Sequence, residues 1–293
     1  MPKLIVTKWI KKQKSNVVDE TKKVVWITGA SSGIGQALAL EYVRQGAAVI
    51  LSARRESVLN GVKKECVDAG ALEQNVLVLP LDVTQEETLE SSTEKAFAFK
   101  GQIDLLINNA GISQRSSCLN TTMPTYRTLF DVDVFGQIAL TKCVLPLMIK
   151  QGFGHIAVTS SVAGKIGVPY RTGYCAAKHA VMGFFDALRS EVAHQNISVS
   201  TITPGFIRTN VSKNALAGDG SAFGQVDENI SGGMAAGDCA KVVVAGLNKG
   251  KKEIAVGKGS EMHALWIKRF FPNLLTKILE KQYKKRAAKG TYK

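Results

Sequence analysis

The most constraining feature of this chain is a glycine-rich turn near its start. An apolar, β-branched run at 24–28 leads into Thr28-Gly29-Ala30-Ser31-Ser32-Gly33-Ile34-Gly35, and a stretch of helical character follows. A strand, a glycine turn and a helix in this order place free backbone N–H groups and a helix N-terminus where they bind a pyrophosphate. An ordinary strand-to-helix turn is the alternative, and the order of the elements favours the phosphate site.

Each residue of this turn has an expected task. Gly29 permits the tight turn, Gly33 lets the backbone approach the phosphates, and Gly35 lets the helix pack closely on the sheet. The cofactor-binding residues expected in this turn are Gly29, Ser31, Ser32, Gly33, Ile34 and Gly35.

Apolar runs alternate with helical stretches over the next two hundred residues. The runs predicted as strands are 24–28, 48–52, 76–80, 103–107, 155–159, 197–202 and 253–256, and those predicted as helices are 34–45, 58–69, 86–99, 125–150, 174–195 and 236–248. Strands that are apolar throughout indicate a parallel sheet that helices cover on both faces. We therefore expect an α/β fold with a doubly wound, mainly parallel sheet of the Rossmann type, formed by one domain over 23–257.

The net charge of +14 is concentrated at the two ends of the chain. Residues 1–23 hold seven Lys/Arg against two Asp/Glu, residues 258–293 hold ten against two, and the rest holds 21 against 20. The near-neutral body has no basic face with interleaved aromatic residues, so we expect no nucleic-acid partner. Residues 1–22 are predicted to be a basic N-terminal segment, and 258–293 a basic extension.

The C-terminal extension has apolar residues at helical spacing with lysines and arginines between them. The pattern runs from Met262 to Leu279 and is interrupted at Pro272, and a basic end follows from Tyr283. A basic amphipathic helix suits peripheral contact of residues 260–293 with a membrane. It also suits docking on the chain's own subunit or a partner subunit, over the substrate cleft, and the two alternatives are compatible.

The cysteines bear on the compartment. They are five in number and widely spaced, without a C-x-x-C pair. This pattern favours a reducing compartment over a disulfide framework or a zinc site. We saw no apolar run of membrane-spanning length, so the expected location is cytoplasmic, with attachment to a membrane surface left open. The four histidines have no ligand spacing, and no metal is expected.

The ends of the second and third predicted strands bear on the cofactor. An acidic residue after the second strand would bind a ribose 2′-hydroxyl and indicate NAD, but this chain has Arg54. A guanidinium matches a 2′-phosphate, so NADP(H) is predicted, with two solvated surface arginines, Arg54 and Arg55, as the alternative. The third strand is followed by Asp82 and Val83, where Asp82 either accepts from the adenine amino group or caps a helix that begins at Thr84.

Tyr174 and Lys178 stand four residues apart and so share a helix face. An ammonium one turn from a phenol stabilises its phenolate, which a tyrosine needs in order to act as a general acid. Ser161 follows the fifth predicted strand, where loops of such sheets line the ligand crevice. A Y-x-x-x-K pair alone is a weak signal, and a solvated or packing pair is its ordinary explanation.

The motifs gain weight from their order. Four motifs follow one another along the chain. They are T-G-x-x-x-G-x-G, Asn108-Asn109-Ala110-Gly111, a serine thirteen residues before Y-x-x-x-K, and P-G-x-x-x-T from Pro204 to Thr209. Over about 22–257 the sequence resembles the short-chain dehydrogenase/reductase family. Three stretches, 108–115, 154–189 and 203–283, look most like its member-7 group.

The resemblance implies an NADP(H)-dependent oxidoreductase that transfers hydride between the nicotinamide and a carbonyl or secondary alcohol. It implies Ser161, Tyr174 and Lys178 as catalytic residues, with Tyr174 and Lys178 also contacting the cofactor. Further cofactor contacts implied are Asn109, Ala110, Gly111, Pro204, Gly205 and Thr209. It also implies a homodimer or homotetramer that pairs through the helices near 125–150 and 174–195.

Two features limit this expectation. The family usually has Asn at the position of Asp133, and an ionised Asp would add negative charge near Lys178. A catalytically weak nucleotide-binding or scaffold protein on the same fold is therefore the alternative function. The glycine-rich segment 206–235 carries Phe206, Val211, Leu216, Ala217 and Phe223, which suits either a lid over a hydrophobic or lipid-like substrate or a loop packed on the sheet.

Overall fold

A seven-stranded sheet forms the centre of the molecule. The computed structural model describes residues 23–225 and 227–288. The strands are β1 (Val24–Thr28), β2 (Ala48–Ser52), β3 (Val76–Val78), β4 (Leu105–Asn108), β5 (Gly154–Thr159), β6 (Ile197–Pro204) and β9 (Glu253–Val256). All are parallel, in the order β3-β2-β1-β4-β5-β6-β9. The expected doubly wound parallel sheet is confirmed.

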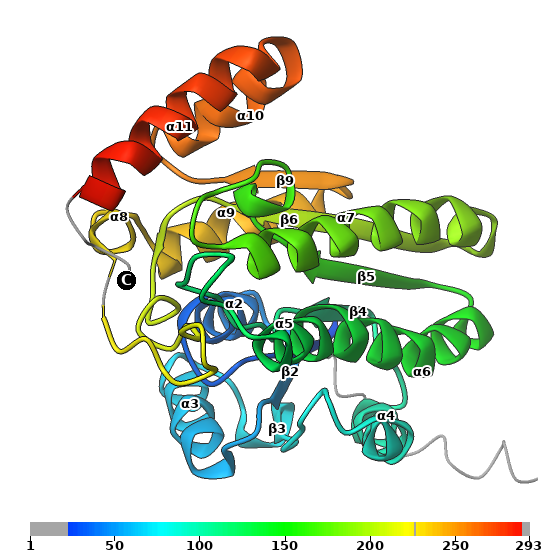
Figure 1. Cartoon of the computed structure of the whole chain (residues 1–293). Coiled ribbons are helices and arrows are strands. Elements are labelled where there is room, and N and C mark those ends of the chain that lie inside the picture. Colours follow the sequence, from blue (N-terminus) through cyan, green and yellow to red (C-terminus); the bar gives the residue numbers. More distant parts are fainter. Residues whose placement is uncertain (1–22, 226, 289–293) are drawn as a thin grey trace, which may run out of the picture.

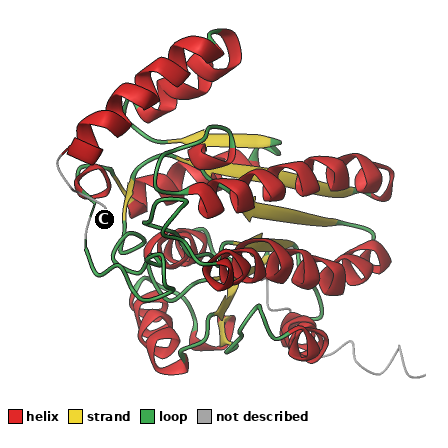
Figure 2. Ribbon diagram, viewed as in Figure 1, coloured by secondary structure: helices red, strands yellow, loops and turns green. Residues whose placement is uncertain are grey.

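Helices cover both faces of this sheet (Figures 1 and 2). They are α2 (Gly33–Arg44), α3 (Glu56–Asp68) and α9 (Ala236–Asn248) on one face, and α4 (Glu86–Lys100), α6 (Gly136–Gln151) and α7 (Thr172–Val192) on the other. Strand β1 shows why both faces are needed. Val25 and Ile27 pack into one core, and Val24 and Trp26 pack into the other. Because successive strand side chains alternate between faces, an all-apolar strand requires cover on both.

The long helix predicted over 125–150 is interrupted. It consists of α5 (Met123–Phe130), a π-helical turn at Asp131–Phe135, and α6. By length and composition alone Met123–Gln151 is apolar enough to cross a membrane, so the expectation that no run of this length exists was wrong. In the fold, α6 instead buries Leu140, Val144 and Met148 against the sheet.

The glycine-rich segment is more regular than its sequence indicates. Strands β7 (Ile207–Arg208) and β8 (Met234–Ala235) form a short parallel pair, and α8 (Glu228–Ser231) lies between them. Ile207, Ala215 and Ile230 are buried. The segment is therefore packed, while its inner side faces the cavity described below.

The C-terminal extension forms a helical hairpin, α10 (Glu261–Phe270) and α11 (Pro272–Ala288). Pro272 opens the second helix rather than breaking a single one, which suits a residue without a backbone N–H. Figure 1 shows the hairpin projecting beyond β9. The predicted N-terminal segment, 1–22, lies outside the described residues, as do residues 289–293 of the extension.

Candidate active site

A cavity of about 1080 Å³ opens at the carboxyl ends of the strands. Each of the first six strands is followed by residues that line it: Gly29 after β1, Arg54 after β2, Asp82 after β3, Asn109 after β4, Ser161 after β5 and Gly205 after β6. The strand order reverses between β1 and β4, and ligands of open α/β sheets bind outside such a reversal. Apart from Gly35, every residue that the sequence predicted for the site lines this one cavity.

The glycine turn has the backbone geometry that its sequence predicts. Gly29 and Gly33 have positive φ angles of 65° and 60°, which L-residues with a side chain rarely adopt. A Cβ on Gly33 would lie 3.1 Å from the Cγ2 of Thr209, so the loops after β1 and β6 approach closely here. Gly35 is buried outside the cavity, where a Cβ would meet the Gly29 carbonyl oxygen. The same Cβ would lie 2.7 Å from the Asn109 Nδ2, so Gly35 lets α2 approach the ends of both β1 and β4.

Asn109 ties three strands together. Its Nδ2 donates to the Thr28 carbonyl oxygen at 3.1 Å, and its Oδ1 accepts from the Thr159 hydroxyl at 3.2 Å. The Thr28 hydroxyl accepts in turn from the backbone N–H groups of Asn109 and Ala110. The Asn109 side chain therefore joins the ends of β1, β4 and β5, and Asn109, Ala110 and Gly111 all line the cavity wall there.

Arg54 and Asp82 lie at the end of the cavity formed by β2 and β3. Arg54 is exposed and lines the cavity. One oxygen of Asp82 accepts from the backbone N–H and the hydroxyl of Thr84, at 3.0 and 2.8 Å. The following helix, α4, begins only at Glu86, so the hypothesis that Asp82 caps a helix starting at Thr84 was wrong. Asp82 stabilises a turn and still faces the cavity, as Val83 does.

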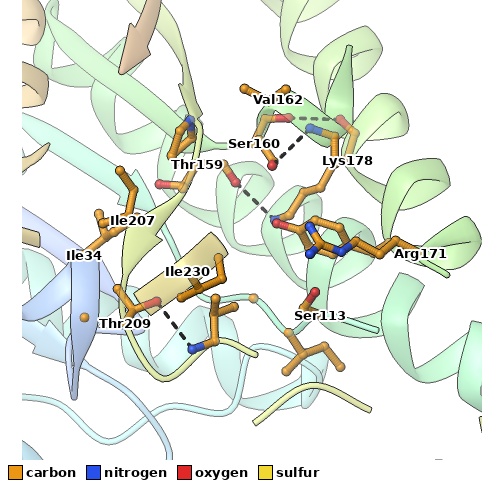
Figure 3. Close-up of a pocket in the computed structure, with 18 of the residues that line it drawn as sticks. Ile34, Ser113, Thr159, Ser160, Val162, Arg171, Lys178, Ile207, Thr209 and Ile230 are labelled. Carbon is orange, nitrogen blue, oxygen red and sulfur yellow. Dashed lines mark hydrogen bonds between the residues drawn. The ribbon is translucent and has the colours of Figure 1, made fainter. Parts of the chain in front are cut away.

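The two adjacent serines after β5 have different environments. The Ser160 hydroxyl is buried and donates to the backbone carbonyl oxygen of Lys178 at 3.1 Å (Figure 3). The Ser161 hydroxyl accepts from the backbone N–H of Ala163 at 3.1 Å, at the start of the 3-10 turn Val162–Gly164. That bond occupies a lone pair of Ser161 and leaves its O–H to donate. Of the two, Ser161 is the one suited to a hydrogen bond with a ligand.

Tyr174 and Lys178 line the cavity from the first turns of α7. The Nζ of Lys178 lies 5.8 Å from the centroid of the Tyr174 ring and donates to the Thr159 carbonyl oxygen at 3.1 Å (Figure 3). Lys178 is almost fully buried. An ammonium held in this way acts on the phenol through a medium of low dielectric, where its field is stronger than in water.

Asp133 is fully buried beside this pair. Its Oδ2 lies 3.5 Å from the Lys178 Nζ, and its Oδ1 accepts from the Ile112 backbone N–H at 2.8 Å. Burial raises the pKa of Asp133, and the Lys178 ammonium opposes this rise. A Cβ on Gly111 would lie 2.9 Å from the Asp133 Oδ1, so this glycine leaves room for the pair. The expected proximity of the Asp133 carboxyl group to Lys178 is confirmed, while the raised pKa favours its neutral form, so the added negative charge stays a prediction.

Sequence reasoning missed the residue that holds the N-terminus of α7. The buried Gln114 side chain accepts from the backbone N–H groups of Gly173 and Tyr174, at 2.8 and 3.3 Å. Gln114 comes three residues after the Asn108–Gly111 motif, and that proximity was the only available signal. The contact fixes where Tyr174 enters the cavity.

A buried ionic cluster near the cavity was also missed. The Oδ2 of Asp227 lies 2.9 Å from Arg171 and 3.5 Å from Arg115. Burial alone would raise the pKa of Asp227, but the two guanidiniums hold it below its usual value. Because 56 and 112 residues separate Asp227 from these partners, nothing local in the sequence predicts the cluster. It anchors the glycine-rich segment beside α7.

The rest of the wall mixes polar side chains with apolar ones from the glycine-rich segment and the hairpin. Phe206, Val211 and Leu216 of the glycine-rich segment line the cavity, whereas Ala217 and Phe223 line a smaller hollow beside it. The hairpin contributes Ile267, Leu275, Ile278 and Leu279 from the other side. Docking of the extension over the cleft of its own subunit, one of the two expected arrangements, is therefore what the structure shows.

Comparison with known proteins places the chain among redox enzymes. The family model described as short chain dehydrogenase matches residues 23–219. The human dehydrogenase/reductase SDR family member 7 is 39% identical over 91% of this chain and 79% of its own length. A member-7-like protein of Drosophila melanogaster is also 39% identical, over 96% and 87%.

Solved structures agree with this assignment. A short-chain dehydrogenase from Streptomyces avermitilis has a TM-score of 0.73 and 29% identity, over 92% of this chain and 98% of its own. A metagenomic short-chain oxidoreductase in complex with NADP has a TM-score of 0.65 and 26% identity, over 80% and 97%. A Burkholderia phymatum protein in complex with NAD, 24% identical with a TM-score of 0.71 over 80% and 88%, shares the fold.

Proposed function

Because this chain belongs to the short-chain dehydrogenase/reductase family, we propose that it is an NADP(H)-dependent enzyme acting on a carbonyl group or a secondary alcohol. The observation that carries the proposal is the convergence of Ser161, Tyr174 and Lys178 on the cavity that the glycine turn also lines. A hydride donor and a proton donor that meet at one carbonyl are what such a reduction requires.

The residues at the strand ends fit a dinucleotide. The N-terminus of α2 opens into the cavity, and within the described part of the chain no side chain caps it. Its free N–H groups and the positive-φ glycines suit a pyrophosphate. We assign Gly29, Ser31, Ser32, Gly33, Ile34 and Gly35 to the phosphate turn, Asp82 and Val83 to the adenine, Asn109, Ala110 and Gly111 to the middle of the cofactor, and Pro204, Gly205 and Thr209 to the nicotinamide end.

When bound, the nicotinamide would exchange a hydride with the carbonyl carbon. Tyr174 would donate its phenolic proton to the carbonyl oxygen, and Ser161 would donate a hydrogen bond to the same oxygen. The Lys178 ammonium would stabilise the phenolate that remains. Lys178 would also bind the ribose hydroxyls of the cofactor, which its place in the cavity lining supports.

The choice of NADP(H) over NAD(H) rests on Arg54. The position after β2 would carry a carboxylate in an enzyme that prefers NAD, and here a guanidinium lines the cavity instead. Replacing Arg54 with Glu should raise the KM for NADPH about 10- to 100-fold, because a charged hydrogen bond contributes about 1.5–3 kcal/mol. The KM for NADH should fall or stay unchanged.

Steady-state kinetics with both cofactors test this assignment. Arg44→Glu is the matched control, since it makes the same charge change at an exposed arginine of α2 that does not line the cavity. An equal loss in both variants, or no loss in Arg54→Glu, would contradict the role of Arg54.

The substrate end of the cavity favours an apolar or lipid-like carbonyl compound. Its wall combines Ile166 and Val168 with Leu216 and the hairpin residues Ile267 and Leu275. A panel of ketones and aldehydes of increasing chain length, assayed by NADPH oxidation, tests this. We expect kcat/KM to rise with chain length, at about 0.8 kcal/mol for each buried methylene.

Asp133 supports a second candidate function, a nucleotide-binding or scaffold protein with little turnover. A carboxylate 3.5 Å from the Lys178 Nζ opposes the field that the phenolate needs. NADPH binding without turnover on any member of the panel would favour this alternative.

Residues 23–257 are assigned as the catalytic domain, with 1–22 and 258–293 as basic appendages. We further propose a cytoplasmic homodimer or homotetramer that pairs through α6 and α7, supported by the exposed Phe135 at the start of α6. Sedimentation of the wild type and of Phe135→Lys tests the pairing.

A further inference from the structure

The C-terminal hairpin has an inner face that is already used. Leu275 of α11 is buried against Val162 and Ile166, next to the catalytic serine. Glu261, at the start of α10, accepts from the Phe206 backbone N–H at 3.0 Å. These contacts fix the hairpin to its own subunit and leave its outer face to be explained.

The outer face carries an apolar tip, which we define as Trp266, Phe270, Phe271 and Leu274. Their exposed fractions are 69%, 60%, 64% and 51%. The rings of Trp266 and Phe270 stack on each other with centroids 5.8 Å apart. The four residues lie within one helical turn of the junction between α10 and α11, in the part of the hairpin that projects beyond β9 (Figure 1). Exposed apolar residues that occur singly need no explanation, but a contiguous group on a rimmed surface marks an interaction site.

The charge around the tip has one sign. Residues 262–279 carry Lys268, Arg269 and Lys277 and contain no Asp or Glu. The acidic residue before this stretch, Glu261, is turned inward to Phe206. An aromatic surface with a basic rim is complementary to the headgroup region of an anionic membrane, where rings sit at the headgroup level and lysines meet phosphates.

A second copy of the chain fits this surface less well. A twofold contact would place each tip on the other, and Lys268, Arg269 and Lys277 would then meet the same charges on the partner. Like charges that face each other across an interface oppose association.

We propose that the apolar tip inserts into the headgroup boundary of an anionic phospholipid membrane and holds the cavity mouth at that surface. The helices that present the tip also line the cavity with Ile267, Ile278 and Leu279. An apolar substrate dissolved in the membrane would thus reach Tyr174 along the hairpin. The access route rests on the proposed function; the membrane contact does not.

Flotation of the full chain with vesicles tests the contact without any assay of turnover. The vesicles are phosphatidylcholine alone or with about 30% phosphatidylserine, a composition that gives the surface a negative potential. The wild type should float with the anionic vesicles and less with the neutral ones. Phe270→Ser with Phe271→Ser should lose most of this binding.

Matched controls separate this effect from a general one. Leu72→Ser with Leu119→Ser removes two other exposed apolar side chains, 60% and 96% exposed, and should float as the wild type does. Lys268→Gln with Arg269→Gln should weaken binding up to about 30-fold, because each basic residue near an anionic surface contributes about 1 kcal/mol, or about fivefold. Lys241→Gln with Lys249→Gln, two exposed lysines on and just after α9, should have little effect.

The outcomes are distinct. Flotation of Phe270→Ser with Phe271→Ser at the wild-type level would overturn the proposal. A loss of self-association in this variant, with flotation unchanged, would assign the tip to a second copy instead. The variant should oxidise NADPH with a water-soluble ketone within twofold of the wild type. If neither protein turns over any ketone, the proposed function fails while the flotation result still decides the membrane contact.

Discussion

At the scale of single residues, the buried Asp133 is the main departure from the family pattern. Its Oδ1 accepts the Ile112 N–H, as an Asn oxygen would, and its Oδ2 faces Lys178 at 3.5 Å. The Asp133 Oδ2 thus takes the place of the amide N–H donor of an Asn, and the nearby Lys178 ammonium is a donor that suits this oxygen. We therefore expect the substitution to be tolerated in catalysis.

Replacing Asp133 with Asn removes a carboxyl group whose ionised form offsets the Lys178 ammonium. The attraction of Lys178 for the Tyr174 phenolate becomes stronger, so the pH profile of kcat/KM should move to lower pH. Activity at neutral pH should change by less than about tenfold, or about 1.4 kcal/mol. Asp131→Asn, an exposed carboxyl in the same π turn, is the control and should leave the profile in place. An inactive wild type that Asp133→Asn restores would contradict tolerance.

His155 should make the fold sensitive to acid. The Ser200 hydroxyl donates to the Lys251 carbonyl oxygen, so it accepts from the neutral His155 Nε2–H at 2.8 Å. Burial, with smaller effects of Lys23 and Lys252, lowers the pKa of His155 to about 4. The folded state therefore favours the neutral ring. The stability that this provides is complete above the unfolded pKa near 6.5 and is lost as the pH falls toward 4, by about 3 kcal/mol.

Urea unfolding at pH 7 and at pH 4 measures this loss. His155→Gln retains a donor but cannot ionise, so its free energy of unfolding should fall less between the two pH values than that of the wild type. An equal fall in both proteins would show that His155 does not contribute.

At the scale of elements, hydrophobic patterning predicted most of the sheet and missed the interruptions. The seven central strands lie where apolar runs predicted them, because a strand buried on both faces is apolar throughout. The break at Asp131–Phe135 could not be predicted from periodicity, since the residues on both sides remain apolar. Strands β7 and β8 are two residues long and are specified by tertiary contacts.

Gly136 shows why α6 must begin where it does. A Cβ at this position would lie 2.7 Å from the Val83 carbonyl oxygen and 2.8 Å from its Cγ2. Gly136→Ala should therefore lower the free energy of unfolding by about 1–3 kcal/mol, the usual cost of overpacking. Gly61→Ala, at an exposed position of α3 with open space around it, should instead raise it by up to about 1 kcal/mol. Chemical denaturation of both variants measures these two changes. An unchanged free energy of unfolding in Gly136→Ala would show that the loop after β3 moves to make room for the added methyl group.

At the scale of the whole molecule, some contacts that form the site can be predicted from the sequence and others cannot. Most residues proposed to bind the cofactor follow strands, and their place at the cavity could be predicted because the carboxyl ends of parallel strands share one edge of the sheet. Tyr174 and Lys178 lie on α7 instead and were predicted from their spacing and the family resemblance. The Arg115–Asp227–Arg171 cluster and the docked hairpin join segments far apart in the chain. Their residue types indicated only a basic and amphipathic character, and the fold decided which side chains meet.

The charge of the molecule is divided between its body and its two ends. The body is near neutral and holds the cavity, whereas the basic excess lies in the two ends. The hairpin carries Lys268, Arg269 and Lys277 of that excess, and its apolar side chains line the cavity. The appendage therefore bears on substrate access as well as on surface charge.

The central claim is that Tyr174 supplies a proton while NADPH supplies a hydride to one carbonyl carbon. The most direct test is deuterium transfer to a ketone from NADPH that carries deuterium at both positions of the reactive nicotinamide carbon, followed by mass spectrometry of the alcohol. The wild type should place one deuterium on the carbinol carbon. Tyr174→Phe should bind NADPH with similar affinity and form labelled alcohol at least about 100-fold more slowly. Unlabelled alcohol from the wild type, or an unchanged rate in Tyr174→Phe, would contradict the account.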